Sequence, residues 1–149
     1  MLKIETATAE LHEWAASLMT GSDPWIRLGT TREQCLKACR HPEHMLYVAH
    51  DEEQPMGLII LHPHGLAGSP YIKSVCVSEK ARNRGVGAAL VEFAEKLFKK
   101  DSKHIFLCVS SFNKRAQLFY QRMDYEQVGE FKDYIIPGES ELLMHKILR

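Results

Sequence analysis

Arginine and glycine residues that could hold a phosphate group lie between an apolar run and an amphipathic segment. Residues 72–77 form a mostly apolar run with three β-branched residues, and residues 86–97 place apolar side chains at helical spacing. Arg82, Arg84 and Gly85-x-Gly87 stand between them. A helix N-terminus offers unpaired N–H groups and partial positive charge, and glycine lets a ligand approach the backbone. The pattern predicts a diphosphate site with two arginine donors, or else an empty strand-to-helix turn.

The ligand class follows from what the motif matches. A P-loop requires Gly-x-x-x-x-Gly-Lys-Ser/Thr, which the chain lacks, and a dinucleotide fingerprint requires Gly or Ala where Leu90 stands. The remaining pattern, Arg82-x-x-Gly85-x-Gly87, resembles the Arg/Gln-x-x-Gly-x-Gly/Ala signature of the GNAT superfamily of N-acetyltransferases. The resemblance implies that acetyl-CoA binds here as a co-substrate.

A second stretch carries the same resemblance. The pattern Asn113-x-x-Ala116-x-x-Phe119-Tyr120 is similar to a later GNAT motif, whose Tyr often protonates the departing CoA sulfur and whose Asn bonds near the pantetheine arm. Spacing alone favours a core tyrosine and a helix cap, whereas the two motifs in order favour function. The implied cofactor-binding residues are Val75, Cys76, Val77, Arg82, Asn83, Arg84, Gly85, Val86, Gly87, Ala88, Asn113, Ala116 and Phe119, with Tyr120 as the catalytic acid.

The residues that would bind the acceptor amine and remove its proton are less clearly indicated by the sequence. An amine with a pKa near ~10.4 must lose a proton before it attacks a thioester at pH 7. Better-known family members carry a Glu on the strand before the glycine turn, but residues 71–74 contain no carboxylate. His62 and His64 could relay the proton through water, and attack without a protein base is the open alternative. The candidate substrate residues are Asp23, Trp25, His62, His64, Tyr71 and Tyr134; Asp23 could attract an ammonium that Trp25 covers, or the two belong to a plain helix-to-helix turn.

Two other classes of function remain open. A non-catalytic acyl-CoA sensor is favoured by the missing strand carboxylate and opposed by Tyr120. A zinc or redox protein would use Cys35, Cys39, His41 and His44, but their spacing fits no common zinc finger, and both cysteines fit the buried stripe of a helix. We therefore expect no metal.

Periodicity and turn residues predict the elements that must position these groups. The expected strands are residues 3–6, 45–50, 56–62, 71–77, 104–109, 125–131 and 141–147, and the expected helices are residues 9–19, 31–40, 86–97 and 113–123. A Thr30-x-x-Glu33 capping box should begin the second helix, residues 21–25 should break the chain, and residues 65–70 should form a loop. The order β-α-α-β-β-β-α-β-α-β-β predicts an α/β (α+β) fold with a mixed sheet between helices, which is also the GNAT order.

Composition bounds the remaining possibilities. The chain has 149 residues, 45% of them apolar, and a formal net charge of zero. The length suits one domain, residues 1–149, and the charge disfavours nonspecific nucleic-acid binding. No apolar run approaches the ~20 residues of a membrane span, and the N-terminus lacks a signal-peptide pattern, so we expect a cytoplasmic protein. The sequence does not identify the acceptor amine, and it is compatible with a homodimer through the last strands.

Overall fold

The chain folds into seven strands and five α-helices. The computed structural model describes residues 1–149. In chain order the elements are β1 (Leu2–Thr6), α1 (Ala9–Thr20), α2 (Trp25–Leu28), α3 (Arg32–Arg40), β2 (Met45–Asp51), β3 (Gln54–Leu66), β4 (Ser69–Val77), a 3₁₀ turn (Glu79–Ala81), α4 (Val86–Phe98), β5 (His104–Ser110), α5 (Lys114–Arg122), β6 (Glu126–Phe131) and β7 (Glu141–Ile147). None of the helices has both the length and the apolar composition that a membrane span requires.

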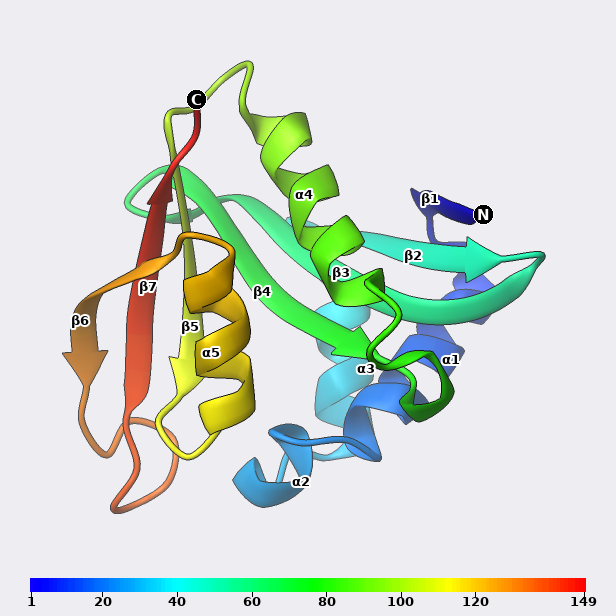
Figure 1. The fold of residues 1–149 in the computed structure, drawn as a ribbon. Helices are drawn as coiled ribbons and strands as arrows, with labels where there is room; N and C mark the ends of the chain where they lie inside the picture. Colours follow the sequence, from blue (N-terminus) through cyan, green and yellow to red (C-terminus); the bar gives the residue numbers. More distant parts are fainter.

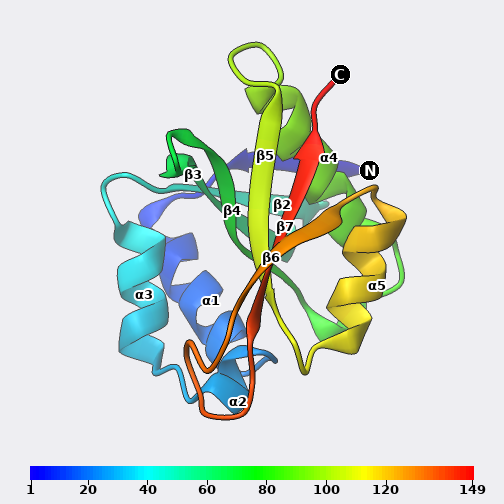
Figure 2. The ribbon, with the colours of Figure 1, turned by 90° about the vertical axis from the view of Figure 1, so that its left-hand side faces the viewer.

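All seven strands join one mixed sheet in the order β1-β2-β3-β4-β5-β7-β6. Every neighbouring pair is antiparallel except β4 and β5, which are parallel and pair only at Tyr71–Phe106 and Ile72–Leu107. Beyond these pairs the two strands diverge, as Figure 1 shows. Helices α1, α2 and α3 lie on one side of the sheet, and α4 and α5 lie on the other (Figure 2). The predicted mixed sheet with helices on both faces is confirmed.

The core consists of two clusters, one on each face of the sheet. Leu58 and Ile60 of β3 belong to the cluster under α1 and α3, whereas Ile59 and Leu61 belong to the cluster under α4 and α5. Successive strand residues point to opposite faces, so a strand buried on both faces requires an unbroken apolar run. This explains why the β3 sequence does not alternate between apolar and polar residues.

The connection between β3 and β4 differs from the predicted loop at residues 65–70. Strand β3 continues to Leu66 and β4 begins at Ser69, so only Ala67 and Gly68 form the turn. Both residues have positive φ, 50° and 80°. This conformation belongs to the tight two-residue hairpin turn whose twist matches that of the flanking strands. Sequence patterns did not indicate this turn, because alanine is not a residue expected in the left-handed region.

Two further details of the N-terminal half differ from prediction. The capping box of α3 is formed by Thr31 and Gln34, one residue later than the predicted pair: Gln34 N donates to Thr31 Oγ1 at 3.1 Å, and Thr31 N donates to Gln34 Oε1 at 2.9 Å. A one-turn helix, α2, begins at Trp25, the last residue of the predicted break. Pro24 precedes its first turn, where a missing N–H costs nothing, and Gly29 ends it with φ 69°.

Candidate active site

The N-terminus of α4 presents main-chain N–H groups that no side chain caps. Gly85 is the N-cap residue, with φ 78°, and Asn83 also has positive φ, 64°. The first helical hydrogen bond in α4 runs from Ala89 N to Gly85 O at 3.0 Å. The N–H groups of residues 86–88 therefore have no partner from a side-chain cap, and the helix dipole adds partial positive charge at the same place. This turn can bind an anion.

Three predicted residues meet at Gly87. A Cβ atom at this position would lie 3.4 Å from the Phe119 ring and 3.7 Å from a methyl group of Val77. The end of β4, the start of α4 and the helix α5 therefore pack together at one point. Asn113 caps α5, since its Oδ1 accepts a hydrogen bond from Ala116 N at 3.2 Å. The fold thus brings the two halves of the sequence pattern to the same end of the sheet.

The two predicted arginines differ in their surroundings. Arg84 Nη2 lies 3.4 Å from Asp51 Oδ2, so its charge is already paired at the end of β2. Arg82 is exposed and forms no ion pair or side-chain hydrogen bond, so its guanidinium is free for a ligand. Arg115, which sequence reasoning missed, donates to Asn83 Oδ1 at 3.3 Å. Its closeness to the glycine turn depends on how α5 packs, which no local pattern reveals.

Tyr120 lies on the inward face of α5, as predicted from helical spacing. It is 9% exposed, and its ring packs against those of Phe119 and Tyr125 at centroid distances of 5.0 and 5.8 Å. Burial raises the pKa of Tyr120, so the phenol keeps its proton at neutral pH. Its hydroxyl has no hydrogen-bond partner in the protein, yet no fully buried polar atom is unpartnered, so the hydroxyl oxygen reaches accessible space. A protonated, unengaged hydroxyl can act as an acid.

The free edge of β4 lies next to this tyrosine's side of the sheet. Because β5 has diverged, residues 73–77 have no strand partner on that edge. Val75 and Val77 pack against the core cluster under α4 and α5. Cys76 points to the opposite face and contacts Ser22, and burial raises the pKa of its thiol to about 11. The edge therefore offers main-chain groups to an amide-containing ligand, and Cys76 stays a neutral core thiol.

A polar cluster lies on the other face of the diverging strands. Ser110 Oγ donates to Glu141 Oε2 at 2.6 Å, and both side chains are buried. Burial raises the pKa of Glu141, and Ser110 and Lys73 act in the opposite direction. Burial also raises the pKa of Tyr71, and the neighbouring Cys108 and Glu141 add to this effect. The resemblance placed residues 134–141 near the acceptor, but the Ser110–Glu141 pair was not predicted, because the two residues meet only through the pairing of β5 with β7.

Helix α2 is tied to the C-terminal half of the molecule beneath this cluster. Arg27 Nη2 lies 3.1 Å from Glu139 Oε2, and its guanidinium lies 4.5 Å from the centre of the Phe112 ring. Ser111 Oγ donates to Glu139 Oε1 at 2.7 Å. Segments from α2, the β5–α5 connection and the β6–β7 loop therefore surround the opening between β4 and β5.

The other predicted acceptor residues differ in their surroundings. Asp23 is exposed, and Trp25 packs against the core cluster under α1 and α3. Tyr134 is 69% exposed, its ring lies 5.4 Å from that of Phe131, and its proximity contributes to the raised pKa of Tyr71. Tyr71 and Tyr134 are thus brought together, whereas Trp25 takes the packed position that the alternative interpretation expects.

The two predicted histidines lie near the start of β4. His62 stands opposite Tyr71 in the β3–β4 register, and its Nε2 lies 3.4 Å from Glu43 Oε2. His64 Nδ1 lies 3.2 Å from the carbonyl of Gly68, in the hairpin that joins the two strands. His62 is therefore the one of the pair that borders Tyr71 directly.

The cysteines and histidines of the zinc hypothesis do not converge on one site. Cys35 and Cys39 lie in the core cluster under the sheet, and burial raises the pKa of Cys39 to about 11. His41 and His44 stack on each other, with ring centroids 4.4 Å apart, and His44 Nδ1 lies 2.7 Å from the carbonyl of Ala38. The cysteines thus occupy the buried stripe of α3 that the sequence allowed.

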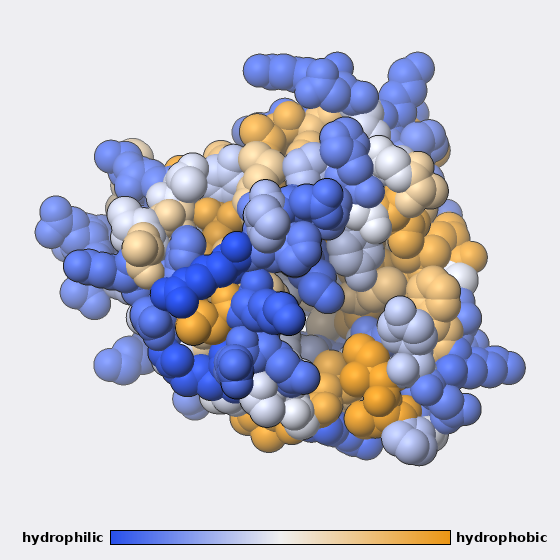
Figure 3. All heavy atoms as spheres, turned by 180° about the vertical axis from the view of Figure 1, so that it is seen from behind, coloured by the Kyte–Doolittle hydropathy of each residue, from blue (hydrophilic) through white to orange (hydrophobic).

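The face of the sheet opposite α4 and α5 is covered only in part. The core cluster under α1 and α3 draws on β2, β3 and β4 but not on β5, β6 or β7. Seen from behind, hydrophilic side chains crowd the left of this face, and apolar side chains gather on its right, over the C-terminal strands (Figure 3). Val128, Phe131 and Ile135 are 54%, 39% and 50% exposed. This side of the C-terminal strands is therefore left open.

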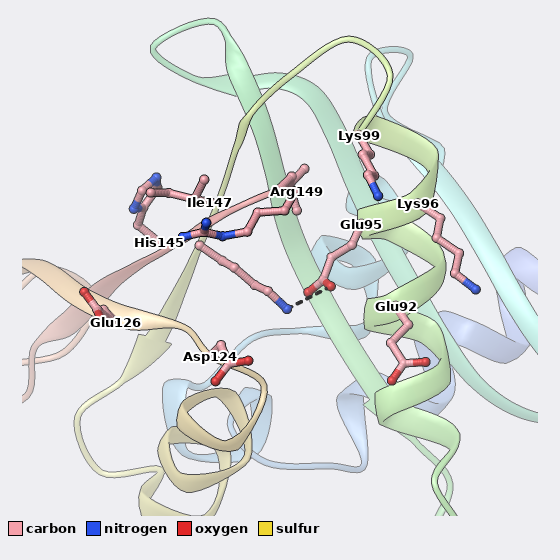
Figure 4. A pocket seen from close by; sticks show the side chains of 11 residues that line it. Glu92, Glu95, Lys96, Lys99, Asp124, Glu126, His145, Ile147 and Arg149 are labelled. Carbon is pink, nitrogen blue, oxygen red and sulfur yellow. Dashed lines mark hydrogen bonds and ion pairs between the residues drawn. The ribbon is translucent and has the colours of Figure 1, made fainter.

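A separate pocket of about 630 Å³ lies at the other end of α4. Figure 4 shows side chains of both charges around it, with Lys146 and Glu95 paired. Its lining residues are Glu92, Glu95, Lys96, Lys99, Asp124, Glu126, His145, Lys146, Ile147, Leu148 and Arg149. None of them belongs to the glycine turn or to the polar cluster, and α4 is about 20 Å long, so this pocket is not part of the candidate active site.

Comparison with known proteins agrees with the geometry. The sequence matches the profile of the acetyltransferase (GNAT) family over residues 8–125. It is 30% identical to an N-alpha-acetyltransferase of Saccharolobus solfataricus over 80 residues, which are 52% of this chain and 48% of that protein, so the match spans about half the length of the curated relative.

Solved structures show the same fold at low identity. A GNAT-family protein from Desulfovibrio desulfuricans superposes with a TM-score of 0.83 at 13% identity over 100% of both chains. The ribosomal-protein-S18-alanine N-acetyltransferase from Escherichia coli gives 0.80 at 14% over 99% of this chain and 94% of that one. An aminoglycoside 6'-N-acetyltransferase complexed with coenzyme A gives 0.79 at 18% over 99% and 97%. The family profile covers most of the sequence and the fold agrees throughout, so the chain belongs to the acetyltransferase (GNAT) family.

Proposed function

We propose that the protein is an acetyl-CoA-dependent N-acetyltransferase, which moves an acetyl group directly from the thioester to a primary amine of a small molecule or a protein. One observation carries the proposal: the uncapped N-terminus of α4 opens where β4 and β5 diverge. A diphosphate on the N–H groups of residues 86–88 would place the pantetheine chain along the free edge of β4. The single domain of residues 1–149 would work in the cytoplasm.

The residues suit a transfer that needs no covalent enzyme intermediate. Main-chain N–H groups at the edge of β4 can polarise the thioester carbonyl as the amine attacks. The C–N bond forms and the C–S bond breaks, and the sulfur takes a proton from Tyr120, whose raised pKa keeps the phenol protonated. Asp23, Trp25, His62, His64, Tyr71 and Tyr134 remain candidate acceptor residues.

Two relatives support the ligand and the type of acceptor. The aminoglycoside 6'-N-acetyltransferase of the same fold is complexed with coenzyme A, and the archaeal relative is an N-alpha-acetyltransferase. Both names describe transfer to nitrogen. An amine acceptor is therefore the first class to test.

A homodimer through β6 and β7 stays a prediction, which sedimentation equilibrium of the purified protein tests.

A non-catalytic acyl-CoA sensor is the second candidate, because β4 carries no carboxylate between residues 71 and 74. Calorimetry with acetyl-CoA, followed by thiol release with a panel of peptide α-amines, polyamines and aminoglycosides, separates the two. Thiol release together with an acetylated product in the mass spectrum supports the transferase. Tight binding without release on any amine supports the sensor, and absence of binding overturns both.

A further inference from the structure

Glu141 is the only charged side chain among the buried residues, and no cation lies within ion-pair distance of it. It is 9% exposed, and no Lys, Arg or His nitrogen forms an ion pair with it. Glu95, the other inward-facing carboxylate, is paired with Lys146 at 3.0 Å. Burying a carboxylate without a counter-ion is costly, so such a group indicates a missing cation or a proton acceptor.

One oxygen of Glu141 is held and the other is free. Oε2 accepts the 2.6 Å hydrogen bond from Ser110, which fixes the orientation of the carboxylate. Oε1 has no hydrogen-bond partner in the protein, and it is not sealed, because no fully buried polar atom lacks a partner. Oε1 can therefore meet a ligand that enters from the open face of the sheet.

Glu141 stands across the sheet from Tyr120. It is the first residue of β7 and pairs with Ser110, the last residue of β5, at the end where β5 has left β4. Leu142 and Met144 pack with Tyr120 in the cluster under α4 and α5, so by strand alternation Glu141 points to the opposite face. A thioester in the opening would have Tyr120 on one side and Glu141 on the other.

The charged and titratable groups around Glu141 come from every neighbouring element. Lys73 and Tyr71 approach from β4 and Cys108 from β5. On its own loop, Glu139 is neutralised by Arg27 of α2. On β6, Glu130 accepts a hydrogen bond from Ser140 at the surface. Lys73 is thus the one cation that acts on Glu141, and it forms no ion pair with it.

We propose that Glu141 is the base that takes the proton from the ammonium group of the acceptor, an inference that rests on the proposed function. The ammonium gives one proton to Oε1, and the neutral nitrogen attacks the carbonyl carbon. The C–N bond forms, and the C–S electron pair goes to sulfur, which takes the proton of Tyr120. A second nitrogen proton restores Tyr120, and Glu141 releases its proton to solvent. The products are an amide, a thiol and one proton.

The unpaired carboxylate would attract the positive charge of a primary ammonium group. A raised pKa suits the role, because a base is most effective when its pKa approaches the working pH. As the pH falls through the pKa of Glu141, the carboxylate becomes protonated and turnover falls. This acidic limb should lie above the ordinary range of a glutamate.

The test is Glu141→Gln, which keeps the size of the side chain and an oxygen for Ser110. For an amine that the wild type acetylates, kcat at pH 7 should fall on the order of 10²-fold, with acetyl-CoA affinity unchanged. The deficit should narrow as the pH rises toward the pKa of the amine, because the amine then arrives neutral. A merely structural role would give the same deficit at every pH.

Glu130→Gln is the matched control, since Glu130 also accepts a 2.6 Å hydrogen bond from a serine but lies exposed. It should leave kcat and its pH profile unchanged. Glu141→Asp, which keeps a carboxylate, should recover part of the rate. If the wild type turns over and Glu141→Gln matches it, Glu141 is not the base and the proposed function stands. If the wild type binds acetyl-CoA but acetylates no amine, both the function and this inference fail.

Discussion

The two sides of the candidate active site are built in different ways. The coenzyme side consists mostly of main-chain groups from one continuous stretch, residues 75–88, which includes the end of β4 and the start of α4. The acceptor side consists of side chains from β4, β5, β7 and α2, which are far apart in sequence. A site made of backbone depends on local conformation, whereas a site made of side chains depends on how distant strands pair. The two sides should therefore respond differently to mutation.

Tyr120→Phe should give the largest effect on kcat, because Tyr120 lies where the coenzyme side and the acceptor side meet. Removing the hydroxyl should lower kcat on the order of 10²- to 10³-fold, the usual range for a general acid. Acetyl-CoA affinity should hold, since the ring remains. Steady-state thiol release and calorimetry measure the two quantities. A loss of affinity in place of rate would mean that Tyr120 only packs against the coenzyme.

Tyr125→Phe is the matched control for this experiment. Tyr125 is the neighbouring buried tyrosine, and its hydroxyl donates to Glu95 Oε2 at 2.9 Å. The change should lower the free energy of unfolding by about 1 kcal/mol while kcat stays the same. Equal losses of kcat in both variants would show that tyrosine hydroxyls act here through stability alone.

Gly87→Val should impair acetyl-CoA binding and leave the acceptor side unchanged. A Cβ at this position already lies 3.4 Å from Phe119, and the added methyl groups would cover the N–H groups of the first turn. Acetyl-CoA affinity should fall at least ~10-fold, a loss of about 1.4 kcal/mol or more. Gly129→Val in β6, where a Cβ would lie 3.6 Å from Leu143, should leave affinity intact. Unchanged binding in Gly87→Val would place the diphosphate elsewhere.

The same contrast explains what the sequence could predict. The glycine turn, the inward face of Tyr120 and most element bounds follow from spacing within a few residues, and the structure agrees with them. The Ser110–Glu141 pair could not be found in this way, because the two residues are 31 positions apart and meet only through the β5–β7 register. The expected carboxylate was sought on β4, whereas the buried one is on β7.

The local differences between the predicted and the observed features have a similar cause, namely contacts that a short stretch of sequence does not reveal. The α3 cap moved from Thr30 to Thr31 because two threonines with suitable partners stand side by side, and packing decides between them. The β3–β4 hairpin was hidden because Ala67 adopts positive φ. Arg84 stays a predicted diphosphate ligand, and the structure adds its contact with Asp51 at 3.4 Å, which no local pattern indicates because the two residues are 33 positions apart.

The two arginines of the glycine turn provide a further test of the coenzyme side. Arg82 is unpaired, whereas Arg84 already interacts with Asp51. A charge-assisted hydrogen bond to a phosphate is worth about 1.5 kcal/mol, so Arg82→Ala should weaken acetyl-CoA binding roughly tenfold at low salt. Arg84→Ala should weaken it less, and both effects should shrink as salt is added. Calorimetry at two salt concentrations measures this, and the reverse order would show that Arg84 leaves Asp51 for the ligand.

Arg27→Ala should give the smallest effect, and it tests the acceptor side alone. Arg27 joins α2 to Glu139 and lies over Phe112, but its side chain is 55% exposed, so the contacts should contribute only about 0.5–1 kcal/mol. Loosening α2 should raise the KM of the amine by roughly twofold to fivefold with acetyl-CoA affinity constant. Arg40→Ala, which removes an exposed ion pair with Glu13 far from the opening, should change neither. If Arg27→Ala weakened acetyl-CoA binding as well, the two sides would be coupled through α2, and the separation between a backbone-built and a side-chain-built half would not hold.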